Sequence, residues 1–187
     1  MEYVDPIKEI DSLNKIKALL KEKSKRDYLL FVFGINTGIR INELLNLKVH
    51  DVLDRNEVKE FLIIPETEKH NEQTFFLNDN VKEAIKDYLS DIKLTGNDFL
   101  FKSKNYDTPI TRQQAYRIIN QAAKKAGING KIGTHTIRKT FGYHAYKKGI
   151  AISILKSIYG HNTPSETLKY IGVNPQNEHP IRVDVNL

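Results

Sequence analysis

The chain has 187 residues, 40% of them hydrophobic and 28% charged, a balance typical of one globular domain with a sizeable core. The sequence contains no cysteine, which excludes disulfides and thiolate metal sites. It shows no signal peptide and no apolar run of membrane-spanning length, so we expect a cytoplasmic protein. The net charge of +6 is uneven, because residues 101–160 hold 12 Lys or Arg and one acid, Asp107, whereas the rest holds 17 basic and 22 acidic residues. This basic block favours a nucleic-acid partner over a solvated basic face.

The first part of the chain shows helical spacing of its apolar residues. Three helices are predicted, over Ile7–Leu20, Arg26–Asn36 and Arg40–Leu47. Asp11 or Ser12 is expected near the start of the first. The second is so apolar that we expect it to be buried.

The middle of the chain changes from helical to β-prone character and back. Val58–Ile64 and Thr74–Leu77 predict an antiparallel hairpin, and a helix over Asp79–Ile92 follows. Thr111 is a predicted N-cap for a helix over Arg112–Ala126. The polar face of that helix suits the major groove of DNA, and its candidate base-contacting residues are Arg112, Gln113, Gln114 and Arg117.

A helix that ends at Gly149 carries His135 and Arg138 three residues apart, so both project from one face. A second face is expected to pack inward, and it consists of Ile137, Phe141, Ala145 and Lys148. A short helix over Ile152–Tyr159 should follow, with Gly160 as a left-handed cap.

The segment Thr163-Pro164-Ser165-Glu166 predicts the start of a last helix, which carries Tyr170 and ends at Gly172. Thr163 is expected to cap it, Pro164 to take the first helical position, and Glu166 to complete a capping box.

The last residues, Ile181–Leu187, alternate strictly between apolar and polar. This period predicts a strand that extends the hairpin, in cis or in trans, against the alternative of a disordered terminus. We therefore expect one domain over residues 1–175 and a tail over 176–187. The predicted class is α+β, mainly α, with a small antiparallel sheet.

Taken singly, each His, Arg or Tyr of the C-terminal part is more often a packing or surface residue than a functional one. Their combination is more specific: His-x-x-Arg at His135, Gly-His at His161, and Tyr170 nine residues later. With Thr37-Gly38-Ile39-Arg40-Ile41-Asn42-Glu43-Leu44-Leu45 upstream, the chain resembles the catalytic domain of tyrosine recombinases, the phage integrase family. The resemblance covers Ile7 to about Gly172.

The resemblance implies a DNA strand transferase that needs neither metal nor cofactor, acts on double-stranded DNA and assembles on it as a tetramer, with a monomer in its absence. The implied catalytic residues are Arg40, Lys69, His135, Arg138, His161 and Tyr170. Glu43 would orient a neighbouring cation, and Lys139 joins the residues expected to contact DNA. The loop around Lys69 is about one residue shorter than usual and lacks the common Lys-Thr pair.

This residue set suits transesterification of a phosphodiester. Two guanidiniums, Arg40 and Arg138, would bind the non-bridging oxygens, where negative charge accumulates. Neighbouring cations would lower the pKa of Tyr170, and a neutral His135 would accept its proton. Lys69 would protonate the leaving 5′-oxygen. Since a 3′-phosphotyrosine link retains the energy of the broken bond, ATP should not be required.

Three alternatives stay open at this point. The fold could serve a DNA-binding regulator with a degenerate site, or a type IB topoisomerase-like enzyme that nicks and reseals. A metal hydrolase using His135, His144 or His161 belongs to another class, and it lacks the usual paired spacing of such ligands. Relatives usually carry an N-terminal helical domain, so the chain is either an excised fragment or a stand-alone catalytic unit.

Overall fold

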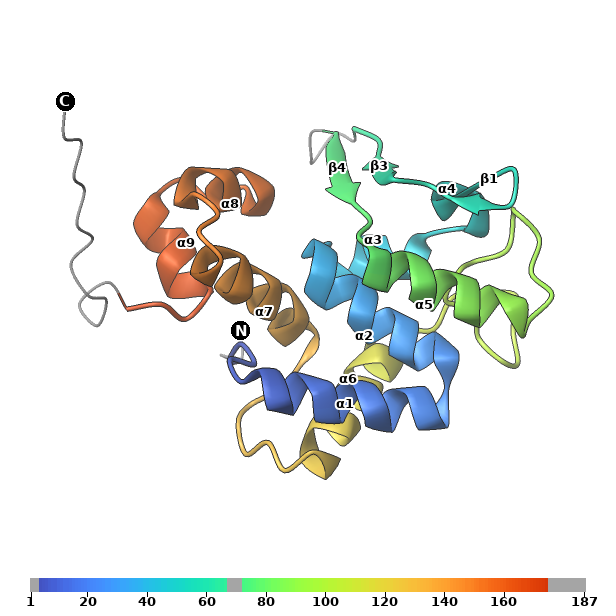
Figure 1. Ribbon diagram of the computed structural model, residues 1–187, viewed down its shortest axis with the longest axis horizontal. Helices are drawn as coiled ribbons and strands as arrows, with labels where there is room; N and C mark the ends of the chain where they lie inside the picture. Colours follow the sequence, from blue (N-terminus) through green and yellow to red (C-terminus); the bar gives the residue numbers. More distant parts are fainter. Residues whose placement is uncertain (1–3, 67–71, 175–187) are drawn as a thin grey trace.

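The computed structural model describes residues 4–66 and 72–174, which fold around one buried helix, α2 (Figure 1). The helices are α1 (Ile10–Lys23), α2 (Lys25–Thr37), α3 (Ile41–Asn46), α4 (Val49–Val52), α5 (Asp79–Ser90), α6 (Arg112–Lys125), α7 (Thr134–Lys147), α8 (Ile152–Tyr159) and α9 (Pro164–Tyr170). The strands are β1 (Leu53–Asp54), β2 (Glu57–Val58), β3 (Phe61–Ile64) and β4 (Gln73–Phe76).

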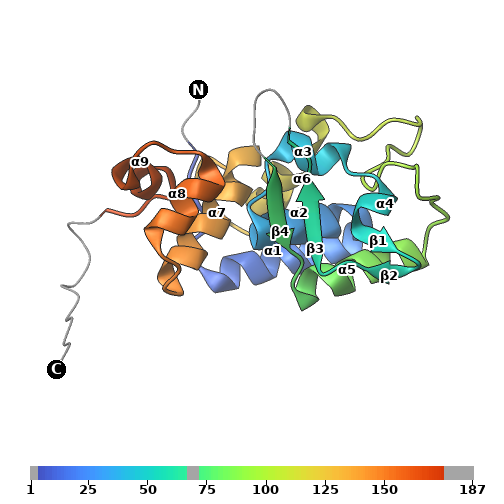
Figure 2. The same cartoon turned by 90° about the horizontal axis from the view of Figure 1, so that it is seen from above.

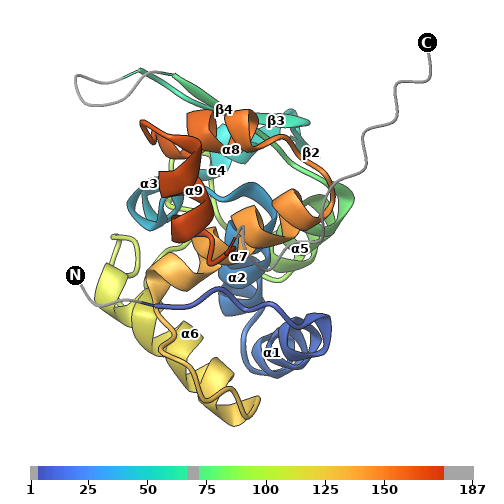
Figure 3. The same cartoon turned by 90° about the vertical axis from the view of Figure 1, so that its left-hand side faces the viewer.

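The central helix α2 begins at a polar cap and is apolar on most sides. Ser24 accepts a hydrogen bond from the backbone of Asp27, and Gly38 ends the helix with φ of 67°. A helix of this kind has to be enclosed, and α1, α5, α6 and α7 surround it in the end-on view (Figure 3). At Gly34 there is no space for a Cβ beside Ile137, so α2 and α7 lie in close contact.

The predicted hairpin exists as β3 and β4, which pair antiparallel with Phe61 opposite Phe76. Leu62 and Phe75 point into the core, whereas Phe61, Ile63 and Phe76 are exposed on the other face. The period of two along each strand explains this division.

The start of the predicted first strand is wrong. Val58 belongs to a separate small hairpin, β1–β2, in which it pairs with Leu53. The turn of this hairpin requires positive φ at Arg55 and Asn56, which sequence periodicity does not register. Figure 2 shows this hairpin at one end of the molecule and α8 and α9 at the other.

In the described part of the chain, apolar side chains form three clusters of buried residues. Two are large, and both include side chains of α2. The third, which we call the satellite cluster, consists of Leu155, Tyr159, Ile171 and Val173. It packs α8 and α9 against α7, at one end of the molecule (Figure 2).

Residues Val4–Lys8, here called the N-terminal strap, run from the start of α7 to the end of α9. The strap is held by Lys139 Nζ donating to Val4 O at 2.8 Å, Ile7 N to Thr140 Oγ1 at 2.9 Å, His144 Nε2 to Ile7 O at 2.9 Å, and Lys8 Nζ to Gly172 O at 2.9 Å. The first residues of the described chain therefore contact both helices that carry the C-terminal motifs.

Two predicted details of helix ends and faces are wrong. Helix α1 begins at Ile10 rather than at Ile7, which lies in the strap, whereas Asp11 stands in its first turn as expected. Lys148 is exposed because it follows the last residue of α7, whereas Ile137 on the same predicted face is buried.

The start of α9 follows the prediction closely. Thr163 Oγ1 accepts from the backbone of Glu166 at 3.1 Å, and Pro164 takes the first helical position. The Glu166 carboxylate accepts from Asn162 N at 2.9 Å rather than from Thr163, so the capping box is displaced by one residue. Gly160 ends α8 in the left-handed region, as predicted.

The predicted class, mainly α with a small antiparallel sheet, is confirmed. Within the described part of the chain, no helix combines the length and apolarity needed to cross a membrane. The predicted tail strand Ile181–Leu187 lies outside the described residues.

Candidate active site

The backbone between α2 and α3 places Arg40. Gly38 turns the chain in the left-handed region, and Arg40 becomes the N-cap of α3. Its Nη1 donates to Glu43 Oε1 and to Gln73 Oε1, both at 3.0 Å, and its backbone N–H donates to Glu43 Oε2 at 3.3 Å. Glu43 therefore contacts a cation, as predicted, and the Arg40 guanidinium is fixed from two elements.

Arg138 projects from α7 and is almost wholly buried, with 7% of its surface exposed. Its Nη2 donates to Ile158 O at 2.9 Å, and its guanidinium lies 4.8 Å from the centre of the Tyr159 ring. Burial lowers the pKa of Arg138 from its ordinary value, yet a guanidinium keeps its charge at neutral pH. Nη1 is shielded from solvent and has no hydrogen-bond partner among the described residues.

His135 stands one turn before Arg138 and faces α6. Its Nε2 lies 3.1 Å from Nη2 of Arg112, the first residue of α6. Burial lowers the pKa of His135, and the positive charges of Arg112, Lys139 and Arg138 add to this effect. The imidazole is therefore neutral at pH 7.

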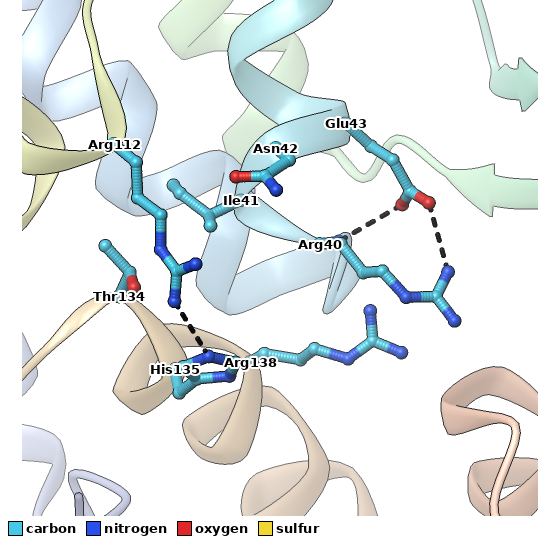
Figure 4. A pocket seen from close by; sticks show the side chains of 8 residues that line it. All are labelled: Arg40, Ile41, Asn42, Glu43, Arg112, Thr134, His135 and Arg138. Carbon is cyan, nitrogen blue, oxygen red and sulfur yellow. Dashed lines mark hydrogen bonds and ion pairs between the residues drawn. The ribbon is translucent and has the colours of Figure 1, made fainter. Parts of the chain in front are cut away.

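These side chains surround one pocket of about 280 Å³ (Figure 4). It is lined by Arg40, Ile41, Asn42, Glu43, Arg112, Thr134, His135 and Arg138. Figure 4 shows the two guanidiniums of Arg40 and Arg138 extending in the same direction from α3 and α7. With a third guanidinium from α6 and one carboxylate, the pocket suits an anion.

Tyr170, at the end of α9, lies beside this pocket rather than in its lining. Its ring centre is 5.0 Å from that of Tyr159 and 5.1 Å from that of His161. Burial raises the pKa of Tyr170, and the charges of Arg138 and Arg40 only partly offset the rise. The two arginines do lower this pKa, as predicted, but desolvation outweighs them and the net shift is upward.

Tyr159 is the other tyrosine close to Arg138. Its hydroxyl donates to the backbone oxygen of Arg138 at 2.9 Å, and burial raises its pKa far above the ordinary value. Because the oxygen is buried and already bonded, Tyr159 is a packing residue of the satellite cluster in this structure.

His161 follows the left-handed Gly160 and is placed by α9. Its Nδ1 lies 3.1 Å from Thr167 Oγ1, whose own proton is directed to Thr163 O at 3.3 Å. The threonine oxygen thus accepts from His161 Nδ1, which leaves Nε2 for another partner. Burial lowers the pKa of His161; Glu166 opposes this shift and Arg138 reinforces it.

The remaining predicted residues divide into three groups. Arg112, Gln113, Gln114 and Arg117 are exposed on α6. Lys139 is buried, and its ammonium bonds to the strap and lies 5.2 Å from the centre of the Tyr170 ring, so the structure does not place it on a DNA-facing surface. Lys69 lies outside the described residues.

Two contacts of the site escaped the sequence reasoning. Gln73 supports Arg40 across 33 residues of sequence, and Thr167 supports His161. Thr167 could have been found, because it lies six residues after His161 on the helix that carries Tyr170. Gln73 gave no such signal, since the register of the hairpin decides which of its residues reaches the pocket.

The three histidines of the metal-hydrolase alternative have separate partners: His135 bonds to Arg112, His144 to the strap, and His161 to Thr167. Across residues 4–66 and 72–174 no group of three His, Cys, Asp or Glu is arranged to hold a metal ion. This geometry does not support a histidine-liganded centre.

Comparison with known proteins shows the family of this chain. The model of the phage integrase family matches residues 7–177. The probable integrase/recombinase YoeC of Bacillus subtilis is 41% identical over 174 residues, which cover 93% of this chain and 92% of YoeC. Tyrosine recombinase XerA of Pyrococcus furiosus is 28% identical over 166 residues, or 87% of this chain and 56% of that protein. The chain thus spans little more than half the length of XerA.

Solved structures show the same fold. A crystal structure of XerA recombinase superposes with a TM-score of 0.75 at 24% identity, covering 94% of this chain and 61% of that one. The post-cleavage complex of XerH site-specific recombinase with its palindromic difH substrate gives a TM-score of 0.71 at 21% identity, covering 88% and 48%.

Proposed function

The chain belongs to the phage integrase family, and we propose that it acts as the catalytic domain of a site-specific tyrosine recombinase. In this reaction duplex DNA is cleaved and rejoined through a 3′-phosphotyrosine intermediate. The residues assigned to it are Arg40, Lys69, His135, Arg138, His161 and Tyr170, with Glu43 in support.

One observation carries the proposal: the two guanidiniums of Arg40 and Arg138 share a pocket beside Tyr170, and Arg138 Nη1 has no partner there. A buried donor without an acceptor is costly, because it has lost water and gained nothing in return. A phosphate oxygen would supply the acceptor. Arg40 is already bonded to Glu43 and Gln73, so it is held in place for the same anion.

The proposed chemistry follows from these positions. The Tyr170 oxygen attacks phosphorus, and its proton goes to neutral His135 as the phosphotyrosine bond forms. The bond from phosphorus to the 5′-oxygen breaks, and that oxygen takes a proton from Lys69. Arg40 and Arg138 hold the non-bridging oxygens, and His161 joins them as a donor from Nε2 once that nitrogen carries a proton. The reverse sequence with another 5′-hydroxyl rejoins the strand.

Tyr170 has to lose its proton from a buried position where the phenolate is unfavourable. The attack therefore needs a free base and a bound phosphate at the same time. This requirement protects the hydroxyl while DNA is absent, and it agrees with a site that forms fully only on its substrate.

Double-stranded DNA is the proposed partner, through the basic block and the exposed face of α6. Arg117→Ala should relax sequence preference, whereas Lys125→Ala should weaken binding to all sequences alike. Equal, sequence-independent losses in a binding-site selection with both variants would exclude base contact by Arg117.

A solved lambda integrase fragment is a dimer bound to a core site. We propose self-association on DNA for this chain too, with cytoplasmic action.

The decisive experiment is covalent capture. Duplexes that bind the Tyr170→Phe protein are selected from a randomised pool, and the selected sequence is rebuilt with a nick beside each candidate scissile phosphate so that the cleaved piece is lost. With EDTA present, the wild-type chain should form a protein–DNA adduct that resists denaturation.

The Tyr170→Phe variant should bind the same duplex and form no adduct. Tyr159→Phe is the matched control: it removes a buried hydrogen bond worth about 1 kcal/mol and should still form the adduct. Binding without any adduct would identify a DNA-binding regulator. An adduct that reseals only its own strand, with no exchange between duplexes, would identify a topoisomerase-like enzyme.

Lys69 is proposed as the general acid, and a 5′-bridging sulfur tests it because sulfur leaves without protonation. Lys69→Ala should slow cleavage of the normal phosphodiester far more than that of the sulfur substrate. Equal slowing of both would remove Lys69 from this role.

A further inference from the structure

The contact between Arg112 and His135 joins the N-terminus of α6, the helix assigned to DNA contact, to the proposed general base on α7. Arg112 Nη2 lies 3.1 Å from His135 Nε2, and Figure 4 shows the Arg112 side chain extending from α6 to the imidazole. A guanidinium only donates, so His135 Nε2 has to accept. The imidazole is thereby held neutral, with its proton on Nδ1.

Among the described residues, the charges that shift the pKa of His135 are all positive. They come from Arg112 on α6 and from Arg138 and Lys139 on α7. The carboxylate of Glu43, across the pocket on α3, is bonded to Arg40 instead. Nothing in this set favours a protonated His135, so its only basic nitrogen is Nε2, and that nitrogen is occupied by Arg112.

Arg112 itself has no ion pair with a carboxylate among residues 4–66 and 72–174, and its side chain is exposed. Arg40, by contrast, is neutralised by Glu43 at 3.0 Å. A phosphate that enters the pocket would be a far better acceptor for Arg112 than a neutral imidazole, because it carries a negative charge and can accept from both prongs of the guanidinium, whereas the imidazole offers one neutral lone pair.

We propose that Arg112 is a positioning residue that occupies the basic nitrogen of His135 until the scissile phosphate takes the guanidinium away. The inference rests on the proposed recombinase function, and it adds a role for a residue assigned so far only to DNA contact. Without DNA, the proposed general base is blocked. With DNA bound, the same guanidinium becomes a third ligand of the phosphate, and His135 Nε2 is released to accept the tyrosine proton.

The test is nitrogen-15 NMR of the histidines in the Tyr170→Phe chain, which binds the selected duplex without cleaving it. Arg112→Met removes the donors while keeping a side chain of similar length, and Lys124→Met is the control because it removes one charge from the same exposed helix face. In the parent and in Lys124→Met, adding duplex should shift the His135 Nε2 signal. In Arg112→Met, the released signal should be present before DNA is added, and duplex should leave it in place.

Kinetics with the nucleophile restored give a second measurement. At saturating nicked duplex, Arg112→Met should slow adduct formation on the order of 10²-fold, as expected for one lost phosphate donor. The acid limb of its pH–rate profile should move to higher pH, because removing a cation beside His135 raises the pKa of that imidazole. Arg112→Lys, which keeps the charge but not the fork, should recover part of the rate.

The inference is overturned if duplex does not shift the His135 Nε2 signal in the parent, or if it shifts that signal equally in Arg112→Met. An Arg112→Met acid limb identical to that of the wild type overturns it as well. If the wild-type chain still forms the adduct in either case, the recombinase function stands and only the role of Arg112 falls. If no adduct forms from any selected duplex, the proposed function falls, whatever the NMR signals show.

Discussion

The residues proposed to bind phosphate and the residue proposed to attack it lie in two regions that are packed very differently. Arg40, His135 and Arg138, which we call the clamp region, stand on α3 and the first half of α7, against the two large clusters built around α2. Tyr170 stands on α9, which with α8 forms the nucleophile region. That region is held by the satellite cluster and the N-terminal strap.

The difference follows from size as well as position. Helices α8 and α9 have 8 and 7 residues, too few to be stable alone, so their order depends on tertiary contacts. Regions with few buried apolar contacts open most readily. The clamp region is therefore expected to exist before DNA binds, whereas the nucleophile region can open locally and bring the hydroxyl out of its buried position. Four tests break or sharpen this contrast.

Arg138→Lys should have the largest effect, in the clamp region. It keeps the charge but loses the fork that bonds to Ile158, lies against the face of Tyr159 and is proposed to bind the phosphate. We expect adduct formation at saturating DNA to fall on the order of 10²–10³-fold, with hydrogen exchange in α9 little changed. Lys124→Arg serves as a control for altering a cation elsewhere. A variant with normal cleavage would show that Arg138 does not hold the phosphate.

Gly142→Ala should affect the nucleophile region instead. An added Cβ would overlap the Tyr159 hydroxyl and the Ile171 side chain, where α7 meets the satellite cluster. Overpacking of this kind costs about 1–3 kcal/mol, and amide exchange in α8 and α9 should speed up while α2 keeps its protection. Gly96→Ala is the control, because its Cβ meets only His50 at an ordinary 3.5 Å. Uniformly faster exchange throughout the domain would refute a separate nucleophile region.

Thr163→Ala and Thr111→Ala make the same chemical change in two places. Each removes an N-cap hydroxyl, from α9 and α6 respectively, at a cost of about 1 kcal/mol. Thr163→Ala should lower the free energy of local opening around Tyr170, whereas Thr111→Ala should loosen only the start of α6. Exchange rates that change in the same amides for both variants would contradict this separation.

Lowering the pH should have the smallest effect of the four tests on the stability of the two regions. Burial lowers the pKa of His135 in the clamp region and of His161 in the nucleophile region. Below about pH 6.5 the unfolded chain therefore binds more protons than the folded one, and stability falls as the pH drops through the folded values. His161→Gln should flatten the acid dependence of exchange in α9, and His135→Gln should not. If His135→Gln flattened the acid dependence in α9 and His161→Gln did not, the acid sensitivity of α9 would not come from His161.

The sequence was most informative where a few neighbouring residues decide the structure. Gly160 and Thr163 specify their caps almost alone, and the buried α2 follows from its composition. It was least informative where distant segments meet. The Gln73 contact, the burial of Lys139 and the net pKa shift of Tyr170 depend on hairpin register, on the strap and on how deeply α9 packs. The spacing of residues along one helix contains none of that information.

The Lys8 bond to Gly172 has a consequence for the order of folding. It joins residues 164 positions apart, so it closes almost the whole described chain into a loop. Closing such a loop costs chain entropy, and this cost exceeds what a single exposed hydrogen bond contributes while the rest of the chain is unfolded. We expect this bond to form after the folding transition state. Lys8→Met should then speed unfolding with little change in the folding rate, and a slower folding rate in stopped-flow experiments would contradict that order. A newly folding chain would thus assemble the arginines proposed to bind phosphate first and fix Tyr170 last.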